Sequence, residues 1–391
     1  MSQPASDVFP YLLWQSPMVP TNEINSTAIS GDGSRCIAAT FDGPYQGHVP
    51  PLQAPYVVNC WDRSANPPKT LWSHSFEAYE GVFVVAISAD GSRAAAGGWK
   101  KKGEGFAQIY DAATGQKLVT YHFLNRVNAL AFSDDGSVLA IAGNDAYLAQ
   151  SQNGVFPLNP NPLRLPPDTY LESIAITGYG EGAFVLGDHS GNVYLAVNNN
   201  GTIGNSYVWA GGKAIGPIHS VDISKDGTWF VAVGDSASIY LFTPDSIQKQ
   251  KYATSLDLGI GDRFRWVAMS ADGSFITTAE NVGTAGKVYG VQNNDGVLSK
   301  IWEHDVDRNP NCTSTDAVGK YVAIAAGYDL PTYPPGGRLA LLDGTNGTPI
   351  WQFDTQKMAW PCFISLDASG IFGGSDDGIA YYFTPQAKRR S

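Results

Sequence analysis

A short polar segment, Ser-x-Asp-Gly-Ser or a close variant, recurs along the whole chain. Clear copies occupy residues 28–34, 86–92, 131–137, 222–228 and 268–274, and weaker copies occupy 175–181, 314–320 and 364–370. Aligned on the first Ser or Thr, their anchors fall at positions 30, 88, 133, 177, 224, 270, 315 and 365. The copies therefore recur about every 48 residues, a period that indicates eight repeats of one structural unit.

Each repeat contains four short segments that are predicted to be β-strands. An alternating apolar segment leads into the Asp-Gly turn, where the Asp accepts backbone hydrogen bonds and the Gly tolerates a positive φ. A strand of small residues follows, as in RAAAGG at 93–98, then a third such as FAQIYD at 106–111 and a fourth such as KIWEHD at 300–305. Four strands in a period of this length form one antiparallel blade of a β-propeller.

The first segment of the chain completes this count. The eighth repeat has three strands before a polar tail at 384–391, and YLLWQS at 11–16 is similar to the fourth strands of other repeats. We therefore expect an all-β, eight-bladed propeller closed by the strand at 11–16, which removes exposed sheet edges. Seven blades is the alternative, if the seventh repeat is misread. The expected single domain spans 1–391, with blades at about 24–77, 82–124, 127–166, 171–212, 218–258, 264–306, 309–356 and 358–383.

Charge and hydropathy exclude several classes of protein. The 391 residues carry a net charge of −11, and a negative surface repels nucleic acid. The longest uninterrupted apolar run, residues 82–87, is far shorter than the ~20 residues of a membrane span. No basic segment followed by an apolar core opens the chain, so we expect a cytoplasmic protein without a signal peptide.

The four cysteines have no metal-binding spacing and are expected to be free buried thiols. Cys312 and Cys362 occupy the same position of neighbouring repeats, so a disulfide between them is the alternative. The sequence also lacks His-x-His and His-Glu-x-x-His patterns, so no metal is expected.

Two propeller families share features with these repeats. The Ser-x-Asp-Gly turns resemble WD40 repeats, and Trp61-Asp62 forms one Trp-Asp dipeptide. The segments 109–115 and 341–351 resemble the Asp-x-x-Thr-Gly-x-x-x-Trp motif of quinoprotein-dehydrogenase-like propellers, whose Trp docks between blades; the matching residues are Asp111, Thr114, Gly115, Asp343, Gly347 and Trp351. That family stacks its quinone on adjacent cysteines, which this chain lacks. The resemblance therefore implies the architecture, and no cofactor is expected.

One face of the propeller is expected to carry the site. Loops that enter the first strand surround the mouth of the central channel, and the residue five positions before each anchor marks this rim: Asn25, Phe83, Asn128, Glu172, His219, Arg265, Pro310 and Trp360. Glu172, His219 and Arg265 stand on successive blades. A carboxylate, an imidazole and a guanidinium around one cavity would suit acid–base catalysis or the binding of an anionic or carbonyl ligand.

The longest insertions are predicted on the same face. Residues 41–55, 99–105 and 327–337 connect second and third strands, and they are rich in Tyr, Pro or Gly. Tyr is common at interfaces, and long loops are often functional. A partner-binding rim would use Tyr45, His48, Trp99, Tyr328 and Tyr333, with His189 in a nearby turn.

Two functions follow from this arrangement. The first is a binding scaffold that recognises a protein or peptide on the loop face. The second is a propeller enzyme, a lyase, isomerase or hydrolase, with Glu172, His219 and Arg265 acting on a small-molecule ligand in the central funnel. An enzyme needs an enclosed pocket with convergent polar groups, whereas a scaffold needs a broader patch with exposed aromatic residues.

Overall fold

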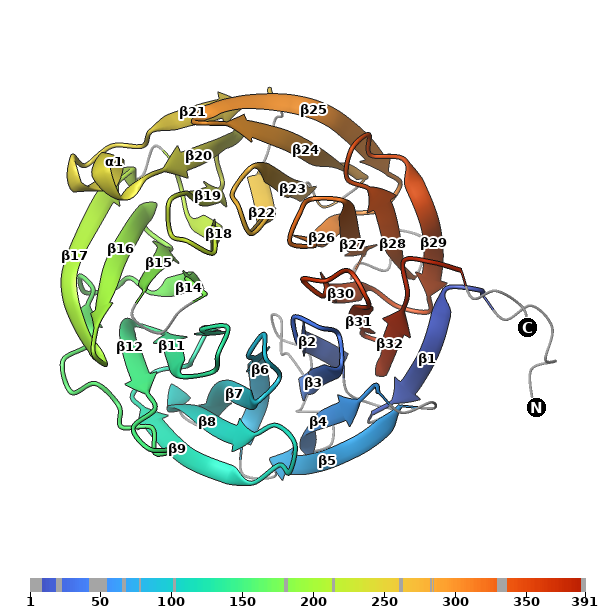
Figure 1. Cartoon of the computed structure of the whole chain (residues 1–391), viewed down its shortest axis with the longest axis horizontal. Coiled ribbons are helices and arrows are strands. Elements are labelled where there is room, and N and C mark those ends of the chain that lie inside the picture. Colours follow the sequence, from blue (N-terminus) through green and yellow to red (C-terminus); the bar gives the residue numbers. More distant parts are fainter. Residues whose placement is uncertain are drawn as a thin grey trace.

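Eight sheets stand side by side around a central axis (Figure 1). The computed structural model describes residues 9–18, 23–41, 55–64, 68–76, 79–100, 103–178, 182–212, 215–259, 263–281, 283, 285–328 and 336–387. Every sheet has four antiparallel strands. The prediction of an all-β, eight-bladed propeller is thus confirmed, and the seven-bladed alternative is wrong.

Each blade takes its strands from the axis outward in chain order. The first four blades contain β2 (Glu23–Ile29), β3 (Arg35–Phe41), β4 (Tyr56–Asp62) and β5 (Lys69–Phe76); β6 (Tyr79–Ile87), β7 (Arg93–Lys100), β8 (Gly105–Asp111) and β9 (Lys117–Phe123); β10 (Ala129–Phe132), β11 (Val138–Ala142), β12 (Asp145–Gln150) and β13 (Leu163–Arg164); β14 (Leu171–Ile176), β15 (Ala183–Asp188), β16 (Asn192–Asn199) and β17 (Thr202–Ala210).

The remaining blades follow the same order. They contain β18 (Ile218–Ile223), β19 (Phe230–Gly234), β20 (Ser238–Phe242) and β21 (Thr254–Asp257); β22 (Arg263–Met269), β23 (Phe275–Asn281), β24 (Gly286–Asn294) and β25 (Val297–Val306); β26 (Pro310–Thr315), β27 (Tyr321–Gly327), β28 (Gly337–Asp343) and β29 (Pro349–Thr355); β30 (Ala359–Ile364), β31 (Ile371–Ser375) and β32 (Ile379–Phe383). A short helix, α1 (Pro244–Gln248), lies between β20 and β21 and is capped by Thr243.

The N-terminal strand closes the ring. β1 (Leu12–Pro17) pairs antiparallel with β32 and becomes the outer strand of blade 8, with Trp14 opposite Tyr382. Trp14 and Phe372 also contact Trp61 of blade 1, with ring centroids 5.1 and 5.7 Å apart. The first and last segments therefore share one sheet, as the sequence predicts, and their aromatic rings pack against blade 1.

The Ser-x-Asp-Gly turns all lie on one face of the ring, which we call the lower face. In six blades the anchor Ser hydroxyl donates to the Asp two residues later and accepts the backbone N–H five residues later; the anchors are Ser30, Ser88, Ser133, Ser224, Ser270 and Ser365. In blade 7 the Asp316 carboxylate takes this place and accepts the N–H of Tyr321 at 2.7 Å. The expected anchor at Thr315 is therefore one residue early.

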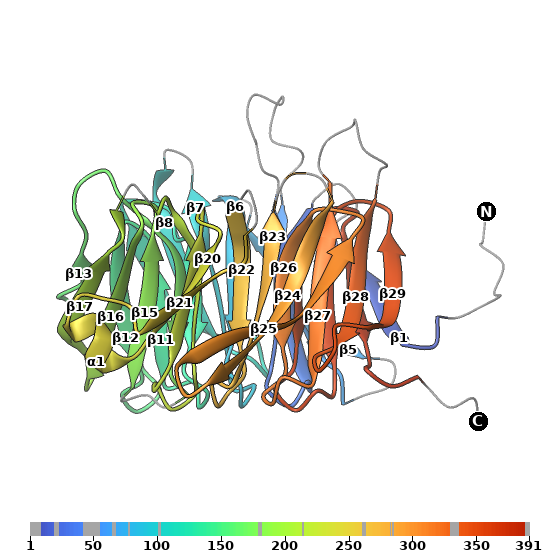
Figure 2. The same cartoon turned by 90° about the horizontal axis from the view of Figure 1, so that it is seen from above.

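These turns are joined to each other by backbone hydrogen bonds. The N–H of one turn donates to a carbonyl of the next turn around the whole ring, with N···O distances of 2.8 to 3.2 Å; the pairs are Gly31–Ala89, Asp90–Asp134, Asp134–Gly178, Gly178–Lys225, Lys225–Ala271, Ala271–Ala317, Ala317–Leu366 and Asp367–Gly31. This closed circuit fixes the inner strands to one another. The opposite, upper face carries the loops that enter the inner strands, and Figure 2 shows the ring edge-on between the two faces.

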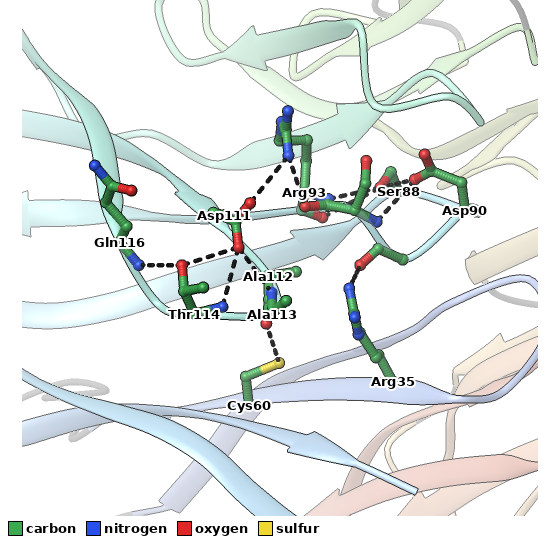
Figure 3. A network of polar contacts seen from close by, with 12 residues as sticks. Arg35, Cys60, Ser88, Asp90, Arg93, Asp111, Ala112, Ala113, Thr114 and Gln116 are labelled. Carbon is green, nitrogen blue, oxygen red and sulfur yellow. Dashed lines mark hydrogen bonds and ion pairs between the residues drawn. The ribbon is translucent and has the colours of Figure 1, made fainter. Parts of the chain in front are cut away.

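Tryptophans of two fourth strands dock against the next blade. Trp72 donates its Nε1–H to the Ala112 carbonyl at 2.9 Å, and Trp302 donates to the Gly344 carbonyl at 2.7 Å. The receiving turn of blade 2 is held by the Asp111 carboxylate, which accepts from Thr114 and the Ala113 N–H (Figure 3). Position 115 requires Gly because its φ is +73° and a Cβ would stand 2.4 Å from Trp72.

The apolar core is divided among the interfaces between blades. Eight buried clusters each join two neighbouring sheets. The four cysteines are buried and free, so the prediction of free thiols is confirmed and the alternative Cys312–Cys362 disulfide is wrong. The part of the chain that the structure describes contains no helix long and apolar enough to cross a membrane.

Candidate functional site

A repeated β-bulge places side chains at the upper mouth of the channel. In blades 4, 5 and 6 the pairing between the first and second strands shifts by one residue at Glu172, His219 and Arg265, respectively. The same shift occurs at Asn25 and Phe83 in blades 1 and 2. A bulge leaves its extra residue without a partner and redirects that side chain. Five of the predicted rim positions are therefore bulged positions.

The structure brings Glu172, His219 and Arg265 together. His219 Nδ1 lies 2.6 Å from Glu172 Oε2, and His219 Nε2 lies 2.7 Å from Asp235 Oδ1. Arg265 Nη1 is 3.3 Å from His219 Nδ1. The His219 side chain is only 6% exposed. Both ring nitrogens therefore face carboxylates, and the Arg265 guanidinium stands beside Nδ1.

Glu172 is the centre of this cluster. Its second oxygen, Oε1, lies 2.8 Å from His189 Nδ1, so one carboxylate holds two imidazoles. Burial alone would raise the pKa of Glu172, but hydrogen bonds from His219 and His189 and the nearby charge of Arg265 lower it below its usual value. The Glu172 side chain is therefore an anion at neutral pH, with 17% of its surface exposed.

His189 occupies the outer end of the cluster. It follows β15 directly, and its ring stacks on Tyr170 with centroids 4.7 Å apart and an interplanar angle of 17°. Its side chain is 47% exposed, in contrast to the enclosed His219.

Aromatic residues of blades 6 and 8 meet across the inner strand of blade 7. Trp266 of β22 approaches Trp360 and Phe363 of β30, with centroids 6.0 and 5.9 Å apart, although blade 7 stands between these strands. All six residues of β26 are buried. The Arg265 guanidinium lies 5.9 Å from the Trp360 ring centroid. The rim position of blade 7 is the bulged Asn311, one residue after the expected Pro310, as follows from the shifted anchor at Asp316.

A second aromatic group lies on the upper face of blades 1 to 3. Phe41, Phe83 and Trp99 contact one another with centroids 5.1 to 6.0 Å apart. The Arg126 guanidinium lies over both Phe83 and Trp99, at 4.4 and 5.3 Å from their centroids. An exposed arginine thus covers two half-buried rings.

The rim asparagines connect neighbouring blades. Asn25 Nδ2 donates to the Phe83 carbonyl at 3.1 Å, and Asn128 Nδ2 donates to the Leu171 carbonyl at 2.8 Å. Asn311 Nδ2 lies 3.3 Å from the Ala359 carbonyl. Their amides are therefore engaged in holding the ring together.

The remaining predicted residues are partly described. Tyr328 directly follows β27 and is half-buried. Tyr45, His48 and Tyr333 lie outside the described residues.

Asp235, Tyr170, Trp266 and Arg126 also lie at the upper face, and the repeat pattern does not predict them. The sequence does contain a signal for Asp235. An Asp is the last residue of the second strand, or directly follows it, in three blades, at Asp188, Asp235 and Asp376.

Two hollows of the described structure lie away from Glu172, His219 and Arg265. One, of about 70 Å³, lies beside Arg126 and is lined by Phe123, Leu124, Tyr147 and Arg164. The other, an open depression of about 510 Å³, lies on the lower face between blades 7 and 8 and is lined by Lys320, Leu366 and Ser369 among others. No group of three or more His, Cys, Asp or Glu side chains suited to a metal ion occurs among the described residues.

Comparison with known proteins identifies the fold. No protein-family model matches the chain, and no curated protein matches its sequence. The structure of Sqt1 from Chaetomium thermophilum, bound to the N-terminus of the ribosomal protein L10, is similar at a TM-score of 0.71 and 11% identity, over 94% of this chain and 98% of that chain. The β-propeller domain of Cps50 (Swd1) from Myceliophteria thermophila is similar at a TM-score of 0.60 and 12% identity, over 77% and 95% of the two chains. At these identities the likeness establishes the β-propeller fold.

Proposed function

We propose that this protein is a binding propeller that holds a protein or peptide segment on its upper face. The observation that carries the proposal is the pairing of arginine with aromatic rings at two places on that face. Arg265 lies beside Trp360, and Arg126 lies over Phe83 and Trp99. Arg and Trp are enriched in the residues that contribute most to protein interfaces.

The scaffold is suited to this role because its rim is fixed before binding. Asn25 and Asn128 bond across blades, and the turns of the lower face form a closed hydrogen-bond circuit. Groups held in place before association lose little conformational entropy on binding. The Sqt1 structure, bound to the N-terminus of a ribosomal protein, supports the proposal as an example of a similar propeller that holds a terminal segment.

The geometry is less favourable to the enzyme alternative. A histidine that acts as a general base must present a nitrogen to the substrate. Both nitrogens of His219 face carboxylates, and its side chain is almost fully enclosed. The Glu172, His219 and Arg265 cluster is therefore better suited to fix charge at the rim than to transfer protons.

Selection from a displayed random-peptide library tests the proposed function. Peptides enriched on the wild-type protein are then measured on Arg126→Ala and Arg265→Ala variants. A matched control is Arg63→Ala, because Arg63 lies 4.8 Å from the ring centroid of Tyr382, near the lower-face turn of Gly33. We expect the upper-face variants to weaken binding and the control to retain it. Peptides that lose binding only on the control variant would refute the proposal.

A further inference from the structure

His189 is anchored through one of its two ring nitrogens. Nδ1 lies 2.8 Å from Glu172 Oε1 and 3.0 Å from the hydroxyl of Tyr170, whose ring stacks on the imidazole. Nε2 has no hydrogen bond to the described residues, and the side chain is 47% exposed. His219, in contrast, has both nitrogens against carboxylates.

The anchoring carboxylate determines where the His189 proton lies. Because hydrogen bonds keep the pKa of Glu172 low, its oxygen is an acceptor and Nδ1 must carry the hydrogen. In the neutral ring Nε2 is then a bare acceptor, as in the carboxylate–imidazole pairs that fix a tautomer at functional sites. The rim therefore presents a hydrogen-bond acceptor of fixed direction.

The charges around His189 favour a cationic donor. Glu172 contacts the ring, and Asp188 precedes it in the chain with its carboxylate bonded to Ser190 and Asn192. The Arg265 guanidinium contacts His219, which binds the other oxygen of Glu172. The net charge of −11 adds a long-range attraction for positively charged partners.

We propose that His189 Nε2 accepts a hydrogen bond from a primary ammonium group of the bound partner, either a lysine side chain or a chain N-terminus. This inference rests on the proposed function and narrows it: the segment held on the upper face carries an amine that is placed at blade 4. Glu172 acts as the positioning residue for the ring, and Tyr170 holds its plane.

The test uses peptides enriched from the displayed library on the wild-type protein. Each peptide is measured with free amines, with only its N-terminus acetylated, and with its lysines replaced by norleucine. Binding is also measured on His189→Phe, which keeps a ring to stack on Tyr170 but has no acceptor. His122→Phe, on the exposed outer strand β9, is the matched control. Nitrogen-15 spectra of the histidine rings report which nitrogen of His189 carries the proton.

We expect one of the two amine changes to weaken binding tenfold or more, and which one does so identifies the source of the ammonium group. His189→Phe should cause the same loss, and His122→Phe should cause none. In the spectra, neutral His189 should be protonated at Nδ1.

The inference would be overturned if the peptides bound His189→Phe as tightly as the wild type and if neither acetylation nor the replacement of lysine weakened their binding. The proposed function would still stand if those peptides were lost on Arg126→Ala or Arg265→Ala, so the two failures are distinguishable. Neutral His189 protonated at Nε2 would also overturn the inference, because the acceptor would then be absent.

Discussion

Replacing Glu172 with Gln removes the charge at the centre of the rim cluster while keeping its shape. The carboxylate makes two short contacts, 2.6 Å to His219 and 2.8 Å to His189, and each nitrogen donates. An amide has only one oxygen, so one contact becomes donor against donor and the other loses its charge assistance. Hydrogen bonds to charged groups are worth roughly 1.5–3 kcal/mol, so we expect a loss of about 2–3 kcal/mol in the free energy of unfolding at pH 7.

The same variant has a signature in its pH dependence. The pKa of Glu172 is lowered in the folded protein from its usual 4.5. Its contribution to stability is therefore fully present above about pH 4.5 and is lost as the pH falls through the folded-state pKa. The difference between wild type and Glu172→Gln should be largest near neutral pH and should shrink in acid.

Urea unfolding followed by tryptophan fluorescence measures both effects. Glu303→Gln is the control, because Glu303 accepts from Lys287 and Lys300 at 2.6 and 2.5 Å and its pKa is lowered to about 2. Its side chain is 39% exposed, however, so solvent screening limits the expected cost to about 0–1 kcal/mol. Equal losses in the two variants, or a Glu172→Gln difference that does not decrease in acid, would refute the reasoning.

Three further predictions concern the scaffold. Gly290→Ala would place a Cβ 2.1 Å from the Trp302 ring, so we expect a loss of about 1–3 kcal/mol in thermal or urea unfolding; Gly204→Ala, with no neighbour nearer than 3.4 Å, should cost less than 1 kcal/mol. Burial raises the pKa of Asp222 to about 6, above its usual 3.8, so its stabilising contribution is complete below about pH 3.8 and is lost as the pH rises through 6. Between pH 4 and 7 the free energy of unfolding of the wild type should therefore fall by about 2–3 kcal/mol relative to that of Asp222→Asn. A difference between the two proteins that stays constant over this pH range would contradict the prediction. A thiol reagent should modify none of the cysteines before unfolding, since all are buried and burial raises the pKa of Cys60 and Cys312 to about 12; rapid reaction of the native protein would contradict the packing.

The propeller architecture was predictable because one recurring turn marks the position of nearly every blade in the sequence. The Ser-x-Asp-Gly segment combines a local hydrogen-bond pattern with a required positive φ at its Gly, and both recur in most blades. The predicted anchor of the seventh repeat, Thr315, was one residue early, because the Asp316 carboxylate accepts the hydrogen bond that a Ser hydroxyl accepts in other blades. The outer strand of blade 3 was not predictable in length, since only Leu163 and Arg164 pair there.

The candidate site was predictable where it follows the repeat. Glu172, His219 and Arg265 share one position of the alignment, and the bulge at that position brings them together. Asp235 and Tyr170 come from other loops, so the repeat alone could not assign them to His219 and His189. Nor could it show that Trp266 reaches across blade 7, which depends on the size of two side chains in three dimensions.

The most direct test of the central claim is hydrogen–deuterium exchange on the protein with and without a peptide selected from the displayed library. We expect binding to slow exchange on the upper face, at residues 124–128, 188–191, 217–219, 263–266 and 358–361, while the lower-face turns at 30–34 and 316–321 stay unchanged. Protection confined to the lower-face turns would contradict the account, because the partner would then bind the face opposite to the proposed one.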